Sequence, residues 1–234
     1  MIPWVLIDTA AIPGGGELRL KRRGAEFSIM LGTNELMNSR LSGSEEALGA
    51  LPCSRLAGRP RPAVLIGGLG MGFTLRAALG VLGLEARVTV AELVPAVVAW
   101  ARGPMAELFA GSLDDPRVAV REGDVGALIA RGREAYDAIL LDVDNGPDGI
   151  TTEGNDRLYG PAGLGAARSA LRPGGILAVW SANPDRAFEA RLRRAGFAVA
   201  VEKVRAHAGR SGARHVIWLA TRPGGAGAQN LAQT

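Results

Sequence analysis

From residue 62 to residue 222 the chain alternates between short apolar runs and segments with helical character, and this alternation limits the possible folds most strongly. A short apolar run bounded by turn residues is typical of a strand buried on both faces of a parallel sheet. Because helical segments separate the first six of seven runs, the pattern predicts an α/β fold with a doubly wound seven-stranded sheet. The seven runs lie at 63–67, 87–93, 117–124, 136–144, 176–183, 198–206 and 214–222. The last two have no room for a helix between them, so we expect an antiparallel hairpin there.

Residues 1–58 follow a different pattern, with little helical periodicity at the start. The segment 17–32 alternates apolar and polar residues around Arg23 and Gly24, which is typical of a β-hairpin. A Pro- and Gly-rich break then precedes the alternating region. We therefore predict a small β-rich N-terminal region over 1–58, a sheet domain over 59–222, and a Gly- and Ala-rich tail over 223–234 that we expect to be flexible.

The charge and composition point to a chain without a nucleic-acid or membrane partner. The net charge is +4. Its densest basic clusters, 19–24 and 191–197, are not interleaved with aromatic residues, so we interpret them as solvated faces. No apolar run is long enough to span a membrane, and the N-terminus lacks the basic region of a signal peptide. We therefore expect a cytoplasmic protein. No His or Cys spacing predicts a metal site. The two histidines, His207 and His215, lie on or beside the last two expected strands, away from the sheet ends that carry ligands, so we expect them to be structural.

A glycine-rich loop follows the first strand of the predicted sheet, where open α/β sheets bind ligands. Its glycines are Gly68, Gly70 and Gly72. The dinucleotide fingerprint requires a Gly or Ala three residues after its second glycine, here Gly70, and that position is Phe73. The loop also lacks the Gly-Lys-Ser/Thr ending of a phosphate-binding loop. The spacing therefore argues against NAD or FAD.

The next three strands each end near an acidic residue: Glu92, Asp124 and Asp142. A carboxylate in the position of Glu92 can accept hydrogen bonds from two ribose hydroxyls, and one in the position of Asp124 can accept a bond from the amine of adenine. Together these residues predict a cofactor that contains adenosine but no diphosphate. The predicted cofactor-binding residues are Gly68, Gly70, Met71, Gly72, Glu92, Leu93, Gly123, Asp124, Val125 and Asp142.

Residues 62–182 resemble a class I S-adenosylmethionine-dependent methyltransferase domain, and more closely the spermidine synthase family. The segments "VLIGGLGMGFTLR", "VTVAELVPAVVAWAR", "LDDPRVAVREGD", "YDAILLD" and "ALRPGGILAV" are similar to segments of that family in the same order. The β-rich N-terminal region is similar to the family's small β domain, which is often involved in dimer formation. The resemblance thus implies an S-adenosylmethionine-type cofactor and makes a homodimer one option.

Four residues, at three places in the chain, depart from the family pattern. Met71 occupies the place of an acid that holds the positively charged end of decarboxylated S-adenosylmethionine in the family. Ser44 and Glu45 occupy the places of Tyr and His in a Tyr-His-Glu run. Asn145 occupies the place of an acid that helps to bind the polyamine, whereas Asp142 matches the family's catalytic base.

These departures favour intact S-adenosylmethionine as the cofactor, because its carboxylate could lie at the free N–H groups of the loop and the following helix. We therefore expect a methyltransferase acting on an unidentified small molecule, with Asp142 as the catalytic base or as a cofactor contact. The predicted substrate-pocket residues are Glu46, Asp144, Asn145, Tyr159 and Trp180.

Three alternatives remain open at this point. The first is a spermidine-synthase-like aminopropyltransferase that uses decarboxylated S-adenosylmethionine and a rearranged set of acids. The second is a non-catalytic binding module that kept the fold. The third, a nucleic-acid methyltransferase, has only the basic charge in its favour.

Overall fold

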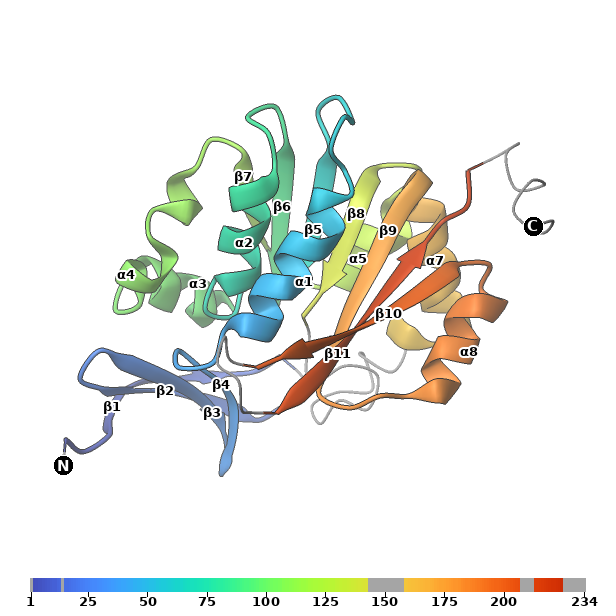
Figure 1. The fold of residues 1–234 in the computed structure, drawn as a ribbon. Coiled ribbons are helices and arrows are strands. Elements are labelled where there is room, and N and C mark those ends of the chain that lie inside the picture. The colour runs from blue at the N-terminus through green and yellow to red at the C-terminus, as the bar shows by residue number, and fades with distance from the viewer. Residues whose placement is uncertain (1, 14, 143–157, 207–212, 225–234) are drawn as a thin grey trace.

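The computed structural model describes residues 2–13, 15–142, 158–206 and 213–224, which form two sheets (Figure 1). The smaller sheet is antiparallel and has the order β1-β2-β3-β4. Its strands are β1 (Val5–Ala11), β2 (Glu17–Arg23), β3 (Glu26–Leu31) and β4 (Asn34–Asn38). The predicted hairpin is β2–β3, and Gly24, with a φ of 61°, lies in its turn.

The larger sheet has seven strands in the order β10-β11-β9-β8-β5-β6-β7. Strands β5 to β9 run parallel to one another, and β11 is antiparallel to both β9 and β10. The strands are β5 (Ala63–Gly67), β6 (Arg87–Glu92), β7 (Val118–Glu122), β8 (Tyr136–Leu141), β9 (Leu171–Ser181), β10 (Ala198–Arg205) and β11 (Arg214–Thr221). The prediction of a doubly wound seven-stranded sheet with a closing hairpin and a small N-terminal β unit is confirmed.

Helices cover both faces of the larger sheet (Figure 1). The helical segments are α1 (Gly43–Ser54), α2 (Phe73–Val81), α3 (Pro95–Arg102), α4 (Ala106–Phe109), the 3₁₀ turn η1 (Ser112–Asp114), α5 (Val125–Arg131), α7 (Pro161–Ala170) and α8 (Arg186–Arg194). Successive side chains of a strand point to opposite faces. Accordingly, Val64 and Ile66 belong to the core under α1, α2 and α3, whereas Leu65 belongs to the core under α5, α7 and α8.

The small sheet and α1 both pack against the larger unit. Leu20 and Ile29 of the small sheet belong to the same buried cluster as residues of α2 and α3. Across this contact, Trp100 Nε1 donates to Asp8 Oδ2 at 2.7 Å. Helix α1 lies within the predicted N-terminal region but packs against α2 and β9. The small sheet is therefore held over the edge of the larger one, and the domain boundary at residue 58 stays a prediction.

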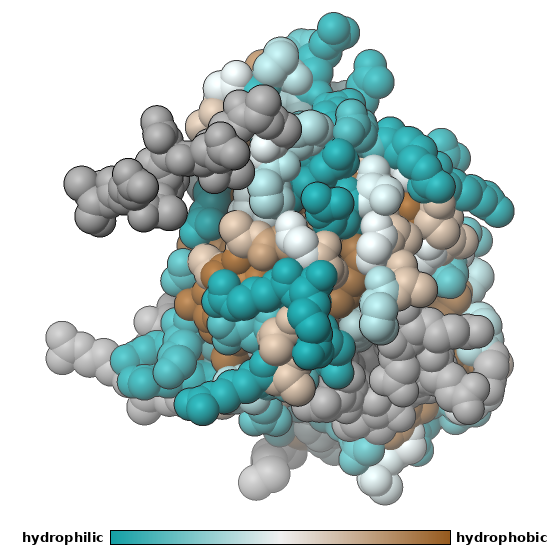
Figure 2. Space-filling view, turned by 90° about the vertical axis from the view of Figure 1, so that its right-hand side faces the viewer, coloured by the Kyte–Doolittle hydropathy of each residue, from teal (hydrophilic) through white to brown (hydrophobic). Residues whose placement is uncertain are grey.

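Helix α8 is amphipathic and forms part of the face shown in Figure 2. It buries Phe188 and Leu192 and exposes Arg193 and Arg194, so this basic cluster does face solvent. Hydrophilic residues cover much of that face (Figure 2). None of the helices in the described part of the chain has the length and apolar character needed to cross a bilayer.

Candidate functional site

The glycine-rich loop between β5 and α2 depends on three glycines in the left-handed region of backbone conformation. Gly68, Gly70 and Gly72 have φ values of 90°, 51° and 81°. Residues with a Cβ rarely adopt such angles. The loop is closed by a hydrogen bond from Gly72 N to Leu69 O at 3.0 Å, and Gly72 caps α2. The spacing of these glycines therefore serves the tight path of the backbone.

We expect Gly72→Ala to destabilise the protein strongly. A Cβ at this position would lie 2.5 Å from the buried ring of Phe109, in addition to the cost of a left-handed Ala. The two effects together cost about 2 kcal/mol or more, which lowers the melting temperature by about 4 °C or more. Gly80→Ala in the same helix is the matched control, because a Cβ there meets nothing within 4 Å. The control should raise the melting temperature, since Ala favours helix over Gly by about 1 kcal/mol. Equal melting temperatures for the two variants would contradict this account.

Glu92, the last residue of β6, is held by backbone donors on both of its carboxyl oxygens. Its Oε2 accepts from Leu69 N at 2.8 Å and its Oε1 accepts from Val94 N at 2.9 Å. The side chain is only 7% exposed, and burial raises its pKa while these backbone bonds lower it. The backbone N–H groups of Gly70 and Leu93 also interact with this carboxyl, which has lone pairs for about four hydrogen bonds. This arrangement suits a pair of neighbouring ribose hydroxyls.

Asp124 follows β7, caps helix α5 and lines the pocket. Its Oδ1 accepts from Gly126 N at 2.7 Å, which caps α5. The side chain also lines the pocket beside Glu92, together with Leu93, Gly123 and Val125. Leu93 is 41% exposed, so an apolar ligand surface can cover it. The cap explains why an acid stands at this position even without a ligand, and its use in binding adenine stays a prediction.

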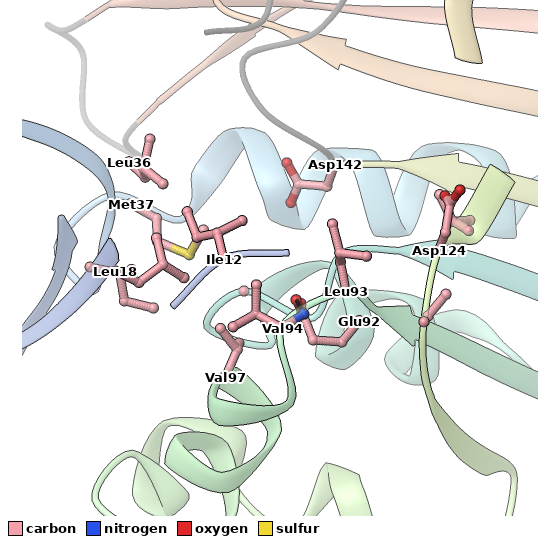
Figure 3. Close-up of a pocket in the computed structure, with 16 residues that line it drawn as sticks. Ile12, Leu18, Leu36, Met37, Glu92, Leu93, Val94, Val97, Asp124 and Asp142 are labelled. Carbon is pink, nitrogen blue, oxygen red and sulfur yellow. Dashed lines mark hydrogen bonds between the residues drawn. The ribbon is translucent and has the colours of Figure 1, made fainter. Parts of the chain in front are cut away.

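Two adjoining pockets contain the predicted site residues, and we call them the first and the second pocket. They share Leu36, Met37, Gly70 and Asp142. The first pocket is lined by Ile12, Leu18, Ile29, Leu36, Met37, Gly68, Gly70, Ala91, Glu92, Leu93, Val94, Val97, Gly123, Asp124, Val125 and Asp142. The second is lined by Leu36, Met37, Asn38, Glu45, Leu69, Gly70, Met71, Gly72, Phe73, Thr74, Asp142 and Trp180. In the first pocket, apolar side chains of the small sheet gather on one side, with Asp142 and Asp124 across from them (Figure 3).

Asp142 directly follows β8 (Figure 3), and it lines both pockets. Its backbone N donates to Gly67 O at 3.1 Å, which fixes its place at the end of the sheet. Thr74 Oγ1 donates to its Oδ2 at 3.1 Å. Burial, followed by the negative charge of Glu45, raises the pKa of Asp142 to about 7. A carboxyl with this pKa can accept a proton near neutral pH, as a general base must.

Glu45, in the first turn of α1, is the second acid beside the glycine-rich loop. Ser44 Oγ donates to its Oε2 at 2.7 Å and lies 2.9 Å from His215 Nδ1. Burial raises the pKa of Glu45, and the hydrogen bond from Ser44 opposes this shift. His215 also makes an edge-to-face contact with Trp180, with ring centroids 4.8 Å apart. A chain of polar groups therefore runs from β11 through α1 to the second pocket.

His215 and Glu45 are the residues of the site that sequence reasoning missed. Sequence reasoning places the two histidines away from the ligand-binding end of the sheet. His215 nevertheless lies at that end, because β11 is antiparallel to β9 and therefore begins where β9 ends. Sequence reasoning also assigned the pocket role to Glu46. Glu46 is exposed and faces a different hollow, formed with Arg76 and Ala77. Successive residues of a helix are about 100° apart around its axis, so Glu45 lines the second pocket whereas Glu46 does not.

The remaining predicted substrate residues fall in different places. Trp180 lines the second pocket, and its Nε1 is buried without a hydrogen-bond partner among the described residues. Tyr159 is 2% exposed and packs edge-to-face on Phe188 in the core, so it does not line either pocket. The structure therefore places Tyr159 in the core and not in the pocket where we expected it. Asp144 and Asn145 lie outside the described residues.

Met71 is 3% exposed and belongs to the hydrophobic core, although it borders the second pocket. It therefore brings no charge to the site. The acids that line the two pockets are Glu45, Glu92, Asp124 and Asp142. None of the described residues that line them is Lys, Arg or His. No three His, Cys, Asp or Glu side chains in the described ranges are grouped as a metal site requires.

Comparison with known proteins gives relatives for about half of the chain. No family model matches. Seven curated relatives match, and all are named polyamine aminopropyltransferases. Polyamine aminopropyltransferase 1 of Streptomyces coelicolor is 36% identical over 127 residues, which are 53% of this chain and 23% of the relative. The chain spans 23% to 39% of the length of the relatives that it matches.

Solved structures with the same fold include two spermidine synthases. The enzyme from Thermotoga maritima superposes with a TM-score of 0.73 at 17% identity, over 93% of this chain and 72% of that one. A spermidine synthase in complex with the transition-state analogue AdoDATO superposes with a TM-score of 0.71 at 18% identity, over the same shares of the two chains. At these identities the likeness establishes the fold.

The prediction of a methyltransferase as the main function is wrong, because the matched relatives are aminopropyltransferases and the matched structures are spermidine synthases. The predicted resemblance itself is confirmed by these matches and by the order of the strands. Over about half of its length the chain is thus similar in sequence to polyamine aminopropyltransferases, and it has the fold of the spermidine synthases.

Proposed function

We propose that this protein transfers an aminopropyl group from decarboxylated S-adenosylmethionine to an amine acceptor of the polyamine type. The observation that carries the proposal is the charge of the site. Four carboxyl groups line the two pockets, and no basic side chain does so among the described residues. Such a site favours ligands that carry positive charge and no negative charge, because an unpaired buried charge is costly.

The same charges argue against intact S-adenosylmethionine. Its carboxylate was expected at the N-terminus of α2, in the space left by the neutral Met71. Asp142 already accepts a hydrogen bond from Thr74 in the first turn of that helix, and Glu45 lines the same pocket. A third carboxylate would meet like charges there. Decarboxylated S-adenosylmethionine has a sulfonium and an ammonium but no carboxylate, so it avoids this repulsion.

The relatives support the same class of reaction. The names of the matched proteins describe aminopropyl transfer to polyamines, and one structural neighbour is in complex with a transition-state analogue. This chain spans less than two thirds of the length of those relatives, so the activity, the acceptor and the cofactor of the whole protein are proposals.

In the proposed reaction, Asp142 takes a proton from the acceptor ammonium and so frees the nitrogen lone pair. The nitrogen then forms a bond to the carbon attached to sulfur, and the carbon–sulfur bond breaks with its electron pair moving to sulfur. The products are the elongated amine and the neutral thioether 5′-methylthioadenosine. The leaving group needs no protonation, so alignment of the reactants, exclusion of water and one base are the contributions required of the protein.

Calorimetric titration tests the cofactor. We expect decarboxylated S-adenosylmethionine to bind at least about 10-fold more tightly than the intact form, because one like-charge contact beside two carboxyls costs about 1.4 kcal/mol or more at a partly exposed site. The preference should weaken at high salt, which screens charges. Equal affinity, or a preference for the intact form, would contradict the proposal.

A further inference from the structure

The residues of the glycine-rich loop that line the second pocket carry no charge. This pocket continues from the first pocket along the loop. Glu92, in the first pocket, accepts a hydrogen bond from Leu69 N, and the loop from Leu69 to Gly72 then borders the second pocket. In the predicted binding mode, with adenine at Asp124 and the ribose at Glu92, the 5′ substituent extends along this loop. The second pocket is where such a substituent ends.

Two carboxyls face this end of the pocket, and they come from different elements. Asp142 follows β8, and Glu45 lies in the first turn of α1. The Thr74 hydroxyl lies 3.1 Å from Asp142 Oδ2 and 3.2 Å from the backbone oxygen of Glu45, so it ties the two elements together. The negative charge of Glu45 contributes to the raised pKa of Asp142, which shows that the two groups interact. A cation between them would relieve this repulsion.

The position of Glu45 is fixed by a buried polar chain. Ser44 is 1% exposed, and its hydroxyl has one proton, which it donates to Glu45 Oε2. His215 Nδ1, 2.9 Å from the same hydroxyl, then acts as the donor to Ser44. Burial lowers the pKa of His215, so the imidazole is neutral when it does so. This bond uses one lone pair of Glu45 Oε2, so the carboxylate can still accept a hydrogen bond from another donor.

We propose that Glu45, held in place by Ser44 and His215, is the carboxylate that binds the ammonium at the end of the aminopropyl group of decarboxylated S-adenosylmethionine. Glu45 thereby provides from α1 the charge that Met71 does not provide from the loop. This inference rests on the proposed function and names the residue that selects its cofactor. Asp142 stays available to the acceptor amine.

The test compares two ligands on four proteins, the wild type and three variants, by calorimetry at pH 7.5. The ligands are decarboxylated S-adenosylmethionine and 5′-methylthioadenosine, which has the same nucleoside but lacks the sulfonium and the ammonium. We expect Glu45→Gln to weaken binding of the first ligand by about 10- to 100-fold, the range for the loss of one charged hydrogen bond. Binding of 5′-methylthioadenosine should stay within about twofold, since this ligand has no ammonium for Glu45 to bind.

Glu46→Gln is the matched control, because it makes the same chemical change one residue away on the exposed side of α1. It should leave both affinities unchanged. Ser44→Ala should lower the affinity for decarboxylated S-adenosylmethionine less than Glu45→Gln does, since the carboxylate remains but loses its support. A thermal melt of each variant identifies any that does not fold.

The outcomes separate the inference from the proposed function. If the wild type prefers decarboxylated S-adenosylmethionine and Glu45→Gln keeps that preference, the inference is overturned and the proposed function stands. If Glu45→Gln weakens both ligands equally, Glu45 has only a structural role and the inference is also overturned. If the wild type binds 5′-methylthioadenosine but shows no preference for decarboxylated S-adenosylmethionine over the intact form, the proposed function fails, and the inference that rests on it fails as well.

Discussion

Replacing Asp142 by Asn should lower the rate of aminopropyl transfer by at least about 100-fold, which is the low end of the contribution of a general base. Asn keeps the shape of the side chain and can still accept the hydrogen bond from Thr74, but it cannot take a proton from the acceptor amine. The measurement is steady-state formation of the elongated amine from decarboxylated S-adenosylmethionine and putrescine. In the wild type, the rate should fall below a pH of about 7, where Asp142 becomes protonated.

The Asn variant should remain folded and should be more stable than the wild type above neutral pH. Because burial raises the pKa of Asp142 to about 7, its carboxyl favours folding at low pH, and this contribution is lost as the pH rises through that value. Asn does not ionise, so its advantage in melting temperature should be larger at pH 8 than at pH 5. An Asn variant that is folded and keeps more than half of the wild-type rate would exclude Asp142 as the base.

Replacing Glu92 by Ala should weaken binding of every adenosine-containing ligand by about 100-fold or more. Glu92 offers its carboxyl oxygens to the ribose hydroxyls, and two hydrogen bonds to a charged group contribute about 3 kcal/mol or more together. The loss should be the same for decarboxylated S-adenosylmethionine and for 5′-methylthioadenosine, because both carry the ribose. This common loss distinguishes Glu92 from Glu45, for which only the charged ligand should be affected.

Glu122→Ala is the matched control for Glu92→Ala. Glu122 ends the adjacent strand β7 and is paired in register with Glu92, but it is exposed and lines neither pocket. Its replacement should leave binding unchanged. Glu92→Ala also removes the acceptors of Leu69 N and Val94 N, so its melting temperature must be measured beside its affinity. A folded Glu92→Ala variant that binds 5′-methylthioadenosine as tightly as the wild type would remove Glu92 from the site.

The sequence was sufficient for the sheet and for the residues at the ends of its strands. Apolar runs and glycines are local signals, and the carboxyl ends of parallel strands necessarily meet at one edge. This is why Glu92, Asp124 and Asp142 could be placed together in advance. The start of β9 could not be predicted in this way, because the strand begins at Leu171, ahead of the apolar run expected at 176–183 and of a Pro-Gly-Gly segment. Pairing of Leu171 with Tyr136 of β8 extends the strand across that segment.

The second acid of the site could not be found in the same way. Glu45 and Glu46 are neighbours in sequence, and only the packing of α1 against α2 and β9 decides which of them faces the loop. The place of His215 depends on the direction of β11, which a strand pattern does not give. Without Glu45, the neutral Met71 leaves room for a carboxylate, and this favours intact S-adenosylmethionine over the decarboxylated form that we propose. The charge of a site is a sum over elements that only the fold brings together.

The most direct test of the proposed function is to incubate the wild-type protein with decarboxylated S-adenosylmethionine and putrescine and to identify the products by mass spectrometry. The account predicts 5′-methylthioadenosine and spermidine in equal amounts, with no product when intact S-adenosylmethionine is supplied instead. Failure to form either product by a folded protein that binds 5′-methylthioadenosine, or transfer of a methyl group from the intact form, would contradict it.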